Sequence, residues 1–295
     1  MRKMGLGSIK VNGKKFNVRE ELGLIRLSIN YMDIVDISEL KGLNKLKNVT
    51  SLDLSNNKIT KLDGLNELPN LQQLFLSNNE IEVIEGLESL VNLDRIFFTG
   101  NKITELKGLD TLTNLQWLEI NNNQINELKG LESLTNLIKL SLVGNQIKEL
   151  QNLDKLSNLV VLQLNRNQIS EIKNLERLTN LERLFLAYNQ ISEIKGLETL
   201  TKLTVLYLNS NKITEIKNLE SLVNLETLYL DTNQITDLHN LESLEKLEKL
   251  KLLYLNFNPV EGEEKQFATD VQDFEVDKVR EFLASYKKWK QANGK

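Results

Sequence analysis

An asparagine returns every 22 residues along most of this 295-residue chain, and this spacing restricts the possible folds more than any other feature. A fixed period of about 20–50 residues is typical of repeat proteins, in which each repeat packs only on its neighbours. The chain is therefore predicted to form one elongated solenoid domain. The repeated asparagines are Asn57, Asn79, Asn101, Asn123, Asn145, Asn167, Asn189, Asn211 and Asn233, followed after a longer interval by Asn258.

The repeat at residues 181–202 shows how each coil is built. Leu184 and Leu186 alternate with outward residues, and this period of two predicts a short strand with one buried face. After Asn189 the apolar spacing loosens, which fits a turn or two of tight helix. We therefore expect a right-handed solenoid with about ten parallel strands in one sheet, one from each coil, and a compact arm between successive strands.

Two columns of residues are interpreted as structural. The repeated asparagines lie where each strand ends, and their amides are expected to satisfy backbone groups that the turn leaves unpaired. Seven residues later every coil carries glycine or asparagine, which predicts a left-handed backbone. This second column consists of Gly64, Gly86, Gly108, Gly130, Asn152, Asn174, Gly196, Asn218 and Asn240.

The beginning of the chain departs from the repeat frame. Asn12-Gly13 is the strongest short signal for a two-residue turn, and it predicts a hairpin in which Val11 aligns with Lys14. Residues 1–21 are therefore predicted to form an N-terminal hairpin cap. The solenoid is expected at residues 22–258, and its irregular first coil is interpreted as a capping repeat.

The end of the chain is predicted to form a second cap at residues 259–295. Its residues Val276, Val279, Leu283 and Tyr286 recur at helical spacing, which predicts an amphipathic helix. One interpretation is that the helix covers the last coil, because solenoids need caps with a polar outer face. The alternative is that it docks a partner or a membrane.

Composition and motifs count against several classes of function. The chain has no cysteine, its formal net charge is −4, and its only histidine, His239, has no histidine or cysteine companion. Disulfides, thiolate metal sites and cysteine nucleophiles are excluded, and no zinc site, calcium loop or phosphate-binding loop is expected. The negative net charge provides no electrostatic argument for binding nucleic acid. We expect no enzyme activity, no metal and no cofactor.

The location of the protein can also be predicted. The first residues lack an apolar run of signal-peptide length, and no stretch of 18 apolar residues occurs anywhere. We expect a cytoplasmic protein without a membrane span.

One outward column of the strands is rich in aromatic residues. Six of its ten positions are aromatic, although Phe, Trp and Tyr make up 6% of the chain. Aromatic and arginine side chains are the usual anchors of protein interfaces. The alternative is that the rings only stack up the sheet and stabilise it. The predicted partner-binding residues are Phe75, Arg95, Phe97, Trp117, Lys139, Arg166, Arg183, Phe185, Tyr188, Tyr207, Tyr229 and Tyr254.

The pattern LxxLxLxxNxIxxIxGLxxLxN over residues 22–258 resembles a leucine-rich repeat of the short, 22-residue subclass. Within that subclass the chain is similar to the protein phosphatase-1 regulatory subunit built of such repeats and to bacterial internalins. The resemblance implies a curved α/β solenoid with a parallel sheet on the concave face and short 3-10 or α segments on the convex face. It also implies binding of other proteins.

We therefore predict a monomeric, non-enzymatic protein–protein interaction scaffold, which could act as a regulatory subunit and binds a folded partner on its concave face. The alternative is an extracellular or surface adhesion module that resembles internalins.

Overall fold

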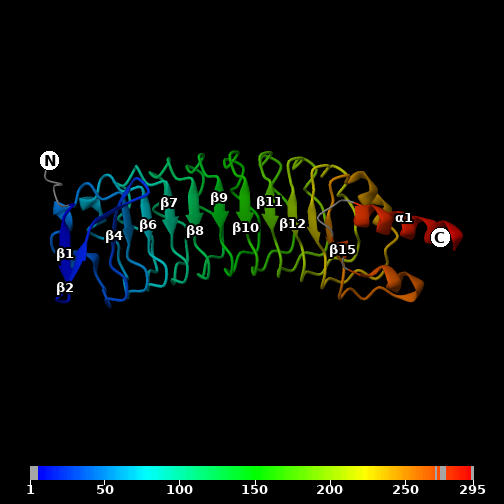
Figure 1. Ribbon diagram of the computed structural model, residues 1–295, viewed down its shortest axis with the longest axis horizontal. Coiled ribbons are helices and arrows are strands. Elements are labelled where there is room, and N and C mark those ends of the chain that lie inside the picture. Colours follow the sequence, from blue (N-terminus) through cyan, green and yellow to red (C-terminus); the bar gives the residue numbers. More distant parts are fainter. Residues whose placement is uncertain (1–5, 270, 273–276, 294–295) are drawn as a thin grey trace. The chain divides into compact units, whose positions relative to one another are not determined.

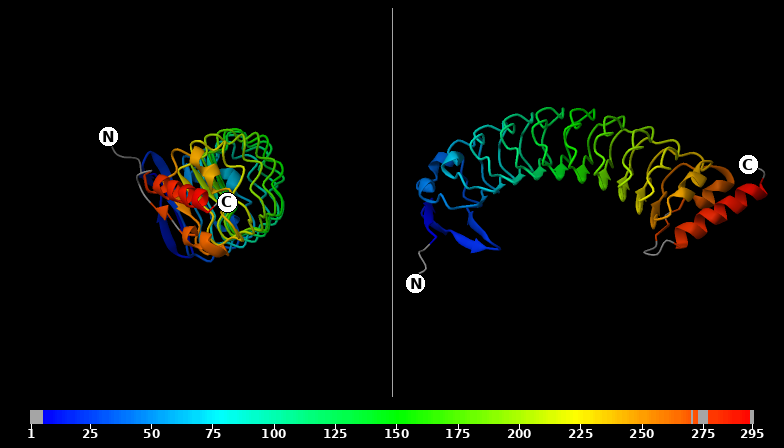
Figure 2. Two further views of the ribbon diagram at one scale, coloured as in Figure 1. Left: turned by 90° about the vertical axis from the view of Figure 1, so that its right-hand side faces the viewer. Right: turned by 90° about the horizontal axis from the view of Figure 1, so that it is seen from above.

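The computed structural model describes residues 6–269, 271–272 and 277–293. It consists of two compact units, Met1–Gln146 and Ile147–Lys295. The repeat frame runs through this division without an insertion, so the sequence contains no signal for it. In both units the strands form one side and the connecting arms form the other (Figure 2).

The first unit begins with a hairpin and continues as a parallel sheet (Figure 1). Strands β1 and β2 pair with each other, β3 is antiparallel to β4, and β4 to β9 follow one another in parallel. The strands are β1 (Ser8–Val11), β2 (Lys14–Asn17), β3 (Arg19–Glu21), β4 (Leu24–Ser28), β5 (Ser51–Asp53), β6 (Gln73–Phe75), β7 (Arg95–Phe97), β8 (Trp117–Glu119) and β9 (Lys139–Ser141).

The second unit repeats the same coil and ends in a cap. Strands β10 to β14 are parallel neighbours in chain order, and β15 pairs antiparallel with β14. The strands are β10 (Val161–Gln163), β11 (Arg183–Phe185), β12 (Val205–Tyr207), β13 (Thr227–Tyr229), β14 (Leu252–Tyr254) and β15 (Val271–Gln272). The single α-helix of the described residues is α1 (Asp277–Ala292).

Regular helix is rarer on the arms than the apolar spacing suggests. The 3-10 segments lie near the ends of the chain, at η1 (Ile37–Glu39), η2 (Leu43–Lys45), η3 (Leu65–Glu67), η4 (Leu241–Lys246) and η5 (Gly262–Phe267). The arms of the intervening coils form single hydrogen-bonded turns instead, as where Leu90 N–H donates to Leu87 O at 2.9 Å. One such turn brings both leucines to the core without a longer helix.

The repeat of 22 residues sets the register of the sheet. Leu184 pairs with Leu206, and each parallel pair of β10 to β13 is offset by this same interval. Equivalent leucines therefore stack in rows, and those of the strands are fully buried. The fold is the predicted leucine-rich solenoid, with a parallel sheet, an N-terminal hairpin cap and a C-terminal helical cap.

Each repeated asparagine joins its own coil to the preceding one. Asn211 is 8% exposed, and its Nδ2 donates to Leu208 O in its own coil at 3.0 Å and to Leu186 O in the coil before at 2.9 Å. Its Oδ1 accepts the Ile191 N–H at 3.0 Å. One buried amide thus satisfies three backbone groups that no strand could pair.

The predicted left-handed backbone occurs at eight of its nine positions, with φ from 57° at Asn152 to 99° at Gly64. The prediction is wrong at Asn240, where φ is −98°. This coil contains three extra residues, and η4 begins directly after Asn240, so the chain enters the helix without a left-handed residue.

The N-terminal hairpin has the predicted register, with Val11 opposite Lys14. Ile9 and Val11 are buried on its inner face, and the turn residue Asn12 donates from Nδ2 to Met32 O at 2.9 Å. The hairpin therefore packs against the first coil. The expected boundary at residues 21 and 22 stays a prediction, and the turn between β3 and β4 lies at this point.

Helix α1 lies against the last coils of its own unit (Figure 2). Val279, Leu283 and Tyr286 are buried on its inner face, and the Tyr286 hydroxyl lies 2.7 Å from Leu238 O. The predicted helix position Val276 lies outside the described residues. The inner face of α1 is thus occupied by the chain itself. Within the described residues, no helix combines the length and apolar character that a bilayer span requires.

Candidate functional site

A first aromatic patch lies on the outer strand face of the first unit. It consists of Phe75, Phe97 and Trp117, which occupy successive strands. The Phe75 and Phe97 rings stack with centroids 4.6 Å apart and an interplanar angle of 2°, and Trp117 follows at 5.9 Å. The three rings of the predicted patch therefore contact one another, because the sheet register places these residues side by side.

Cations of the same unit cover this patch. The Arg26 guanidinium lies 5.4 Å from the centre of the Phe75 ring, and Lys139 Nζ lies 4.2 Å from that of Trp117. Arg95 lies over the same indole at 5.5 Å. Since each such contact stabilises by about 0.5–1 kcal/mol at an exposed site, the ring faces are already in use.

Glu119 further ties the first patch together. Its carboxylate accepts a hydrogen bond from Trp117 Nε1 at 2.9 Å and forms an ion pair with Lys139 at 2.7 Å. The predicted residues Trp117 and Lys139 thus have defined roles inside the unit, which strengthens the stabilising interpretation of this patch.

The second unit carries a longer row, which we call the aromatic ladder: Phe185, Tyr207, Tyr229 and Tyr254. Phe185 meets Tyr207 edge to face at 4.8 Å, Tyr207 meets Tyr229 at 4.2 Å, and Tyr229 stacks on Tyr254 at 3.9 Å with an angle of 14°. All four rings are partly exposed. Such pairs contribute about 0.5–1.5 kcal/mol beyond burial, so the ladder is rigid before any partner binds.

The middle of the aromatic ladder stays uncharged. Burial raises the pKa of Tyr229 above its ordinary value of 10.0, and the phenols of Tyr254 and Tyr207 beside it raise it further. In the described residues of this unit, no arginine or lysine lies over the four rings. The exposed ring surface is therefore open to a second molecule, unlike that of the first patch.

The charges around the aromatic ladder are balanced. Lys251 forms an ion pair with Glu226 at 3.1 Å, and Arg183 and Glu182 are both exposed. The charged residues on and beside these strands comprise three of each sign: Arg166, Arg183 and Lys251 are basic, and Glu182, Glu226 and Asp231 are acidic. This face therefore does not select strongly for an acidic or a basic partner.

The predicted site residues fall into one group in each unit. Phe75, Arg95, Phe97, Trp117 and Lys139 belong to the covered patch of the first unit. The second group lies on or beside the aromatic ladder and consists of Arg166, Arg183, Phe185, Tyr188, Tyr207, Tyr229 and Tyr254. In the second group the four ladder rings have no covering cation among the described residues. Tyr188 is the exception, because the Arg166 guanidinium lies 5.1 Å from the centre of its ring.

Sequence reasoning missed a second left-handed column, one residue before each repeated asparagine. Its residues are Asn56, Asn78, Gly100, Asn122 and Gly144 in the first unit, and Arg166, Tyr188, Ser210, Thr232 and Phe257 in the second. All ten have φ between 52° and 73°. The asparagines and glycines of the first unit are a usable signal, whereas the second unit carries residues for which this backbone costs roughly 1–2 kcal/mol each.

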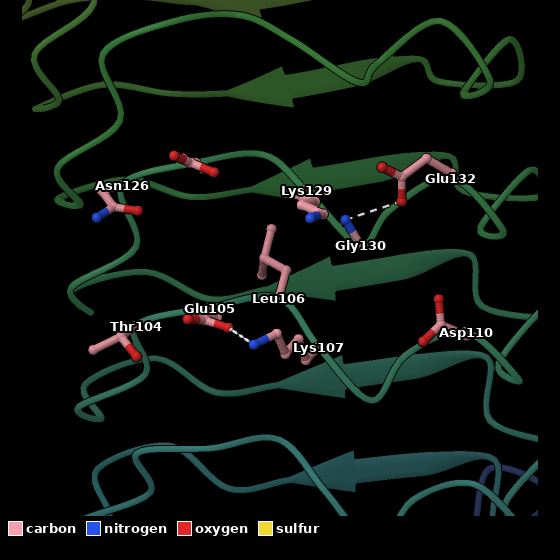
Figure 3. A pocket seen from close by; sticks show the side chains of 10 residues that line it. Thr104, Glu105, Leu106, Lys107, Asp110, Asn126, Lys129, Gly130 and Glu132 are labelled. Atoms are coloured by element: carbon pink, nitrogen blue, oxygen red, sulfur yellow. Dashed lines mark hydrogen bonds and ion pairs between the residues drawn. The ribbon is translucent and has the colours of Figure 1, made fainter.

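A polar hollow on the arms of the first unit is a second candidate site (Figure 3). Three of its charged side chains make local contacts: Glu105 pairs with Lys107, and Glu132 accepts the Gly130 N–H at 2.9 Å. Each of these contacts joins residues two positions apart in one arm, so the side chains serve the arms themselves. The hollow is therefore the groove between two successive arms.

A cluster of His239, Asp237 and Glu264 was also missed from the sequence, because Glu264 comes from the cap. Their ligand atoms lie within 4.8 Å of one another, but both Glu264 oxygens already accept hydrogen bonds. The donors are Leu238 N–H at 2.8 Å and the Tyr286 hydroxyl at 3.0 Å. The buried carboxylate thus anchors the cap to the last coil.

Known repeat families match most of the solenoid. The family model described as Leucine Rich repeats (2 copies) matches residues 69–111, 113–155, 157–199, 179–221 and 201–243, and the model described as Leucine Rich Repeat matches residues 48–68. Together these ranges exceed half of the chain. The chain belongs to the leucine-rich-repeat family. No curated protein matches it significantly.

Solved structures of internalins from Listeria monocytogenes are similar to this leucine-rich-repeat protein. The functional domain of InlJ is 27% identical with a TM-score of 0.65, over 77% of this chain and 47% of that one, so the chain spans about half of its length. Internalin inlF is 25% identical with a TM-score of 0.58, over 85% and 86% of the two chains. Internalin C2 is 34% identical with a TM-score of 0.57, over 62% and 80%.

The comparisons identify the fold more narrowly than the function. In all, 483 chains of solved structures match, so the likeness does not single out one partner. The InlJ domain includes a cysteine ladder, whereas this chain has no cysteine and uses its buried asparagines along the strand ends. Leucine-rich repeats are a protein-interaction fold, which agrees with the interaction scaffold predicted from the sequence.

Proposed function

We propose that this protein is a non-enzymatic scaffold that binds a folded protein partner on the strand face of its second unit. The observation that carries the proposal is the aromatic ladder, in which four stacked rings stand partly exposed without a covering cation. Rigid aromatic side chains bind partners with little loss of conformational entropy, and each central anchor contributes about 2 kcal/mol or more.

The first patch has a different role in this proposal. Its rings hold Arg26, Arg95 and Lys139 of their own unit, so a partner would have to displace these cations before it could reach the aromatic faces. The cost of breaking those contacts lowers the net gain from binding there. The first patch is therefore assigned to stabilising the sheet, and the second unit carries the interface.

The scaffold is further proposed to act as a monomer in the cytoplasm, as a regulatory subunit comparable to the leucine-rich subunit of protein phosphatase-1. A second candidate is an adhesion module at the cell surface, which the likeness to three internalin structures favours. Cell fractionation separates the two. Recovery of the protein mainly from the culture medium or the cell surface would favour adhesion and overturn the cytoplasmic assignment.

The binding test uses the double variant Tyr207→Ala with Tyr229→Ala. The fold should be retained by circular dichroism, because the outward rings leave the buried leucines untouched. Capture of interacting proteins from lysate, followed by mass spectrometry, should lose a specific partner that the wild-type protein retains. The expected loss for two central anchors is on the order of 4 kcal/mol, or about a thousandfold in affinity.

Two control variants keep this test specific. Lys195→Ala with Lys217→Ala alters the arms, where both lysines pair with glutamates, at 2.7 Å for Lys195 and 3.1 Å for Lys217. Phe75→Ala with Phe97→Ala alters the same frame position in the first unit. Both controls should keep the partner. If the tyrosine variant retains the partner and the lysine variant loses it, the interface lies on the arms and the proposal is wrong.

A further inference from the structure

The left-handed column that lies one residue before each repeated asparagine carries different residue types in the two units. Arg166, Tyr188, Thr232 and Phe257 have φ of 58°, 55°, 56° and 60°, a backbone region that bulky and β-branched residues rarely adopt. In the first unit the positions before the five repeated asparagines hold asparagine or glycine, which accept this backbone at little cost, whereas the capping coil carries the exposed Tyr31 there with φ of 59°. The turn is the same in every coil, so the difference lies in the side chains alone.

Burial does not explain the strained residues. Phe257 is 83% exposed and Tyr188 is 52% exposed, and Arg166 and Thr232 are exposed as well. Large exposed aromatic residues in a strained backbone gain nothing from the core. The contact between Arg166 and the Tyr188 ring, at 5.1 Å, recovers part of the cost for that pair and covers one face of this ring, so Phe257 is the aromatic residue of the column that a partner reaches without displacing a cation. In the described residues, no aromatic partner is formed by Phe257.

The column runs beside the aromatic ladder. Each of its residues follows three positions after the ladder position of its own coil, as Tyr188 follows Phe185 and Phe257 follows Tyr254. The parallel register repeats this relation from strand to strand. The two rows therefore widen one surface, and backbone strain in sparsely populated regions is a recurrent mark of functional positions.

We infer that Tyr188 and Phe257, with Arg166 and Thr232 between or beside them, are contact residues that the second unit displays at a cost in stability, and that they bind an uncharged, apolar patch on a folded protein. The inference rests on the proposed function of the aromatic ladder. The choice of occupant follows from charge: the charged residues on and beside these strands comprise three of each sign, and the ladder holds no cation.

Apolar neighbours support the same occupant. Val161, Val205 and Leu252 lie partly exposed on the strands beside the ladder, with the exposed Arg183 between the two valines in the same column. Apolar side chains and uncovered rings lose contact with water most favourably against an apolar partner surface. A strongly acidic or basic partner would meet no excess of opposite charge on this surface.

Stability measurements test the strain without any ligand. Tyr188→Asn with Phe257→Asn should raise the thermal midpoint of the chain, by about 2–4 °C for each relieved residue. The matched control is Asn122→Tyr, the reverse change at the same frame position in the first unit, which should lower the midpoint by a similar amount. A midpoint that stays equal or falls in the double asparagine variant would show that no strain is stored there, and would overturn the inference.

Binding of the uncharged dye Nile red tests the surface, followed by fluorescence titration. The wild-type protein should bind it, the Tyr188→Asn, Phe257→Asn variant should bind at least about fivefold more weakly, and Asn122→Tyr should bind as the wild type does. If the asparagine variant keeps full affinity while Tyr207→Ala with Tyr229→Ala loses it, the ladder stands and the column is not part of the surface. If the tyrosine variant also binds normally, the proposed function fails as well.

Charged peptides test the choice of occupant. Octa-lysine and octa-glutamate should both fail to displace Nile red from the wild-type protein in a buffer of low ionic strength, because the face carries no excess of either sign. Displacement by one of them at micromolar concentration would show that the surface selects a charged partner. That result would overturn the assignment to an apolar patch, whatever the stability measurements show.

Discussion

Replacing Asn145 by alanine tests whether the repeated asparagines hold the coils together. Asn145 is 7% exposed, its Oδ1 accepts the Ile125 N–H at 3.0 Å, and its Nδ2 donates to Ile120 O at 2.8 Å and Leu142 O at 3.0 Å. Leaving the buried N–H unpaired costs about 1–3 kcal/mol, and each weakened carbonyl adds about 0.5–1.5 kcal/mol. Removal of the buried amide offsets part of this, so we expect Asn145→Ala to lose about 2–4 kcal/mol.

The assay is urea unfolding followed by circular dichroism, with Asn136→Ala as the matched control. Asn136 also donates to a backbone carbonyl, Thr113 O at 2.9 Å, but it is exposed, and its loss should cost within about 0.5 kcal/mol. Hydrogen exchange adds a local measurement: the Ile125 amide should lose protection selectively. Equal losses in the two variants, or an unchanged exchange rate at Ile125, would refute the role assigned to the amide.

Two further predictions concern single positions. Gly108→Ala should destabilise by at least about 3 kcal/mol, because an added Cβ would lie 2.0 Å from Ile84 O. Gly64→Ala should cost about 1–2 kcal/mol, because there an added Cβ would lie no closer than 3.6 Å to any other residue; urea unfolding of both variants shows which loses more stability. The pKa of Tyr229 is raised in the folded state, so its contribution to stability is complete below about pH 10 and should fall as the pH rises further. The free energy of unfolding of Tyr229→Phe should therefore depend less on pH above 10 than that of the wild-type protein, and an equal dependence would contradict the raised pKa.

The sequence determined the coil, the sheet register and the asparagine contacts. A strict 22-residue period leaves each residue opposite its equivalent in the next coil, so columns such as Phe185, Tyr207 and Tyr229 follow directly from the spacing. The hairpin register at Asn12-Gly13 was equally predictable, because a two-residue turn determines which residues pair. These features follow from the spacing of the repeat and from the residue types at its turns.

Other features depend on how particular side chains and backbones meet. Arg26 covers Phe75 from two coils earlier in the chain, and no spacing rule distinguishes that contact from an open ring. Asn240 has the residue type of a left-handed position, yet the start of η4 gives it an ordinary φ. In each case the local sequence permitted more than one arrangement, and packing against neighbouring coils selected one.

The left-handed column of the second unit shows the reason most clearly. Tyr188, Thr232 and Phe257 carry no local preference for positive φ, so sequence reasoning passed over them. Their backbone is imposed by the turn that precedes each repeated asparagine, where the buried amide bonds both to its own coil and to the coil before. A local preference against positive φ of about 1–2 kcal/mol is outweighed by several buried hydrogen bonds that form together. Only the tertiary structure decides at which positions this occurs.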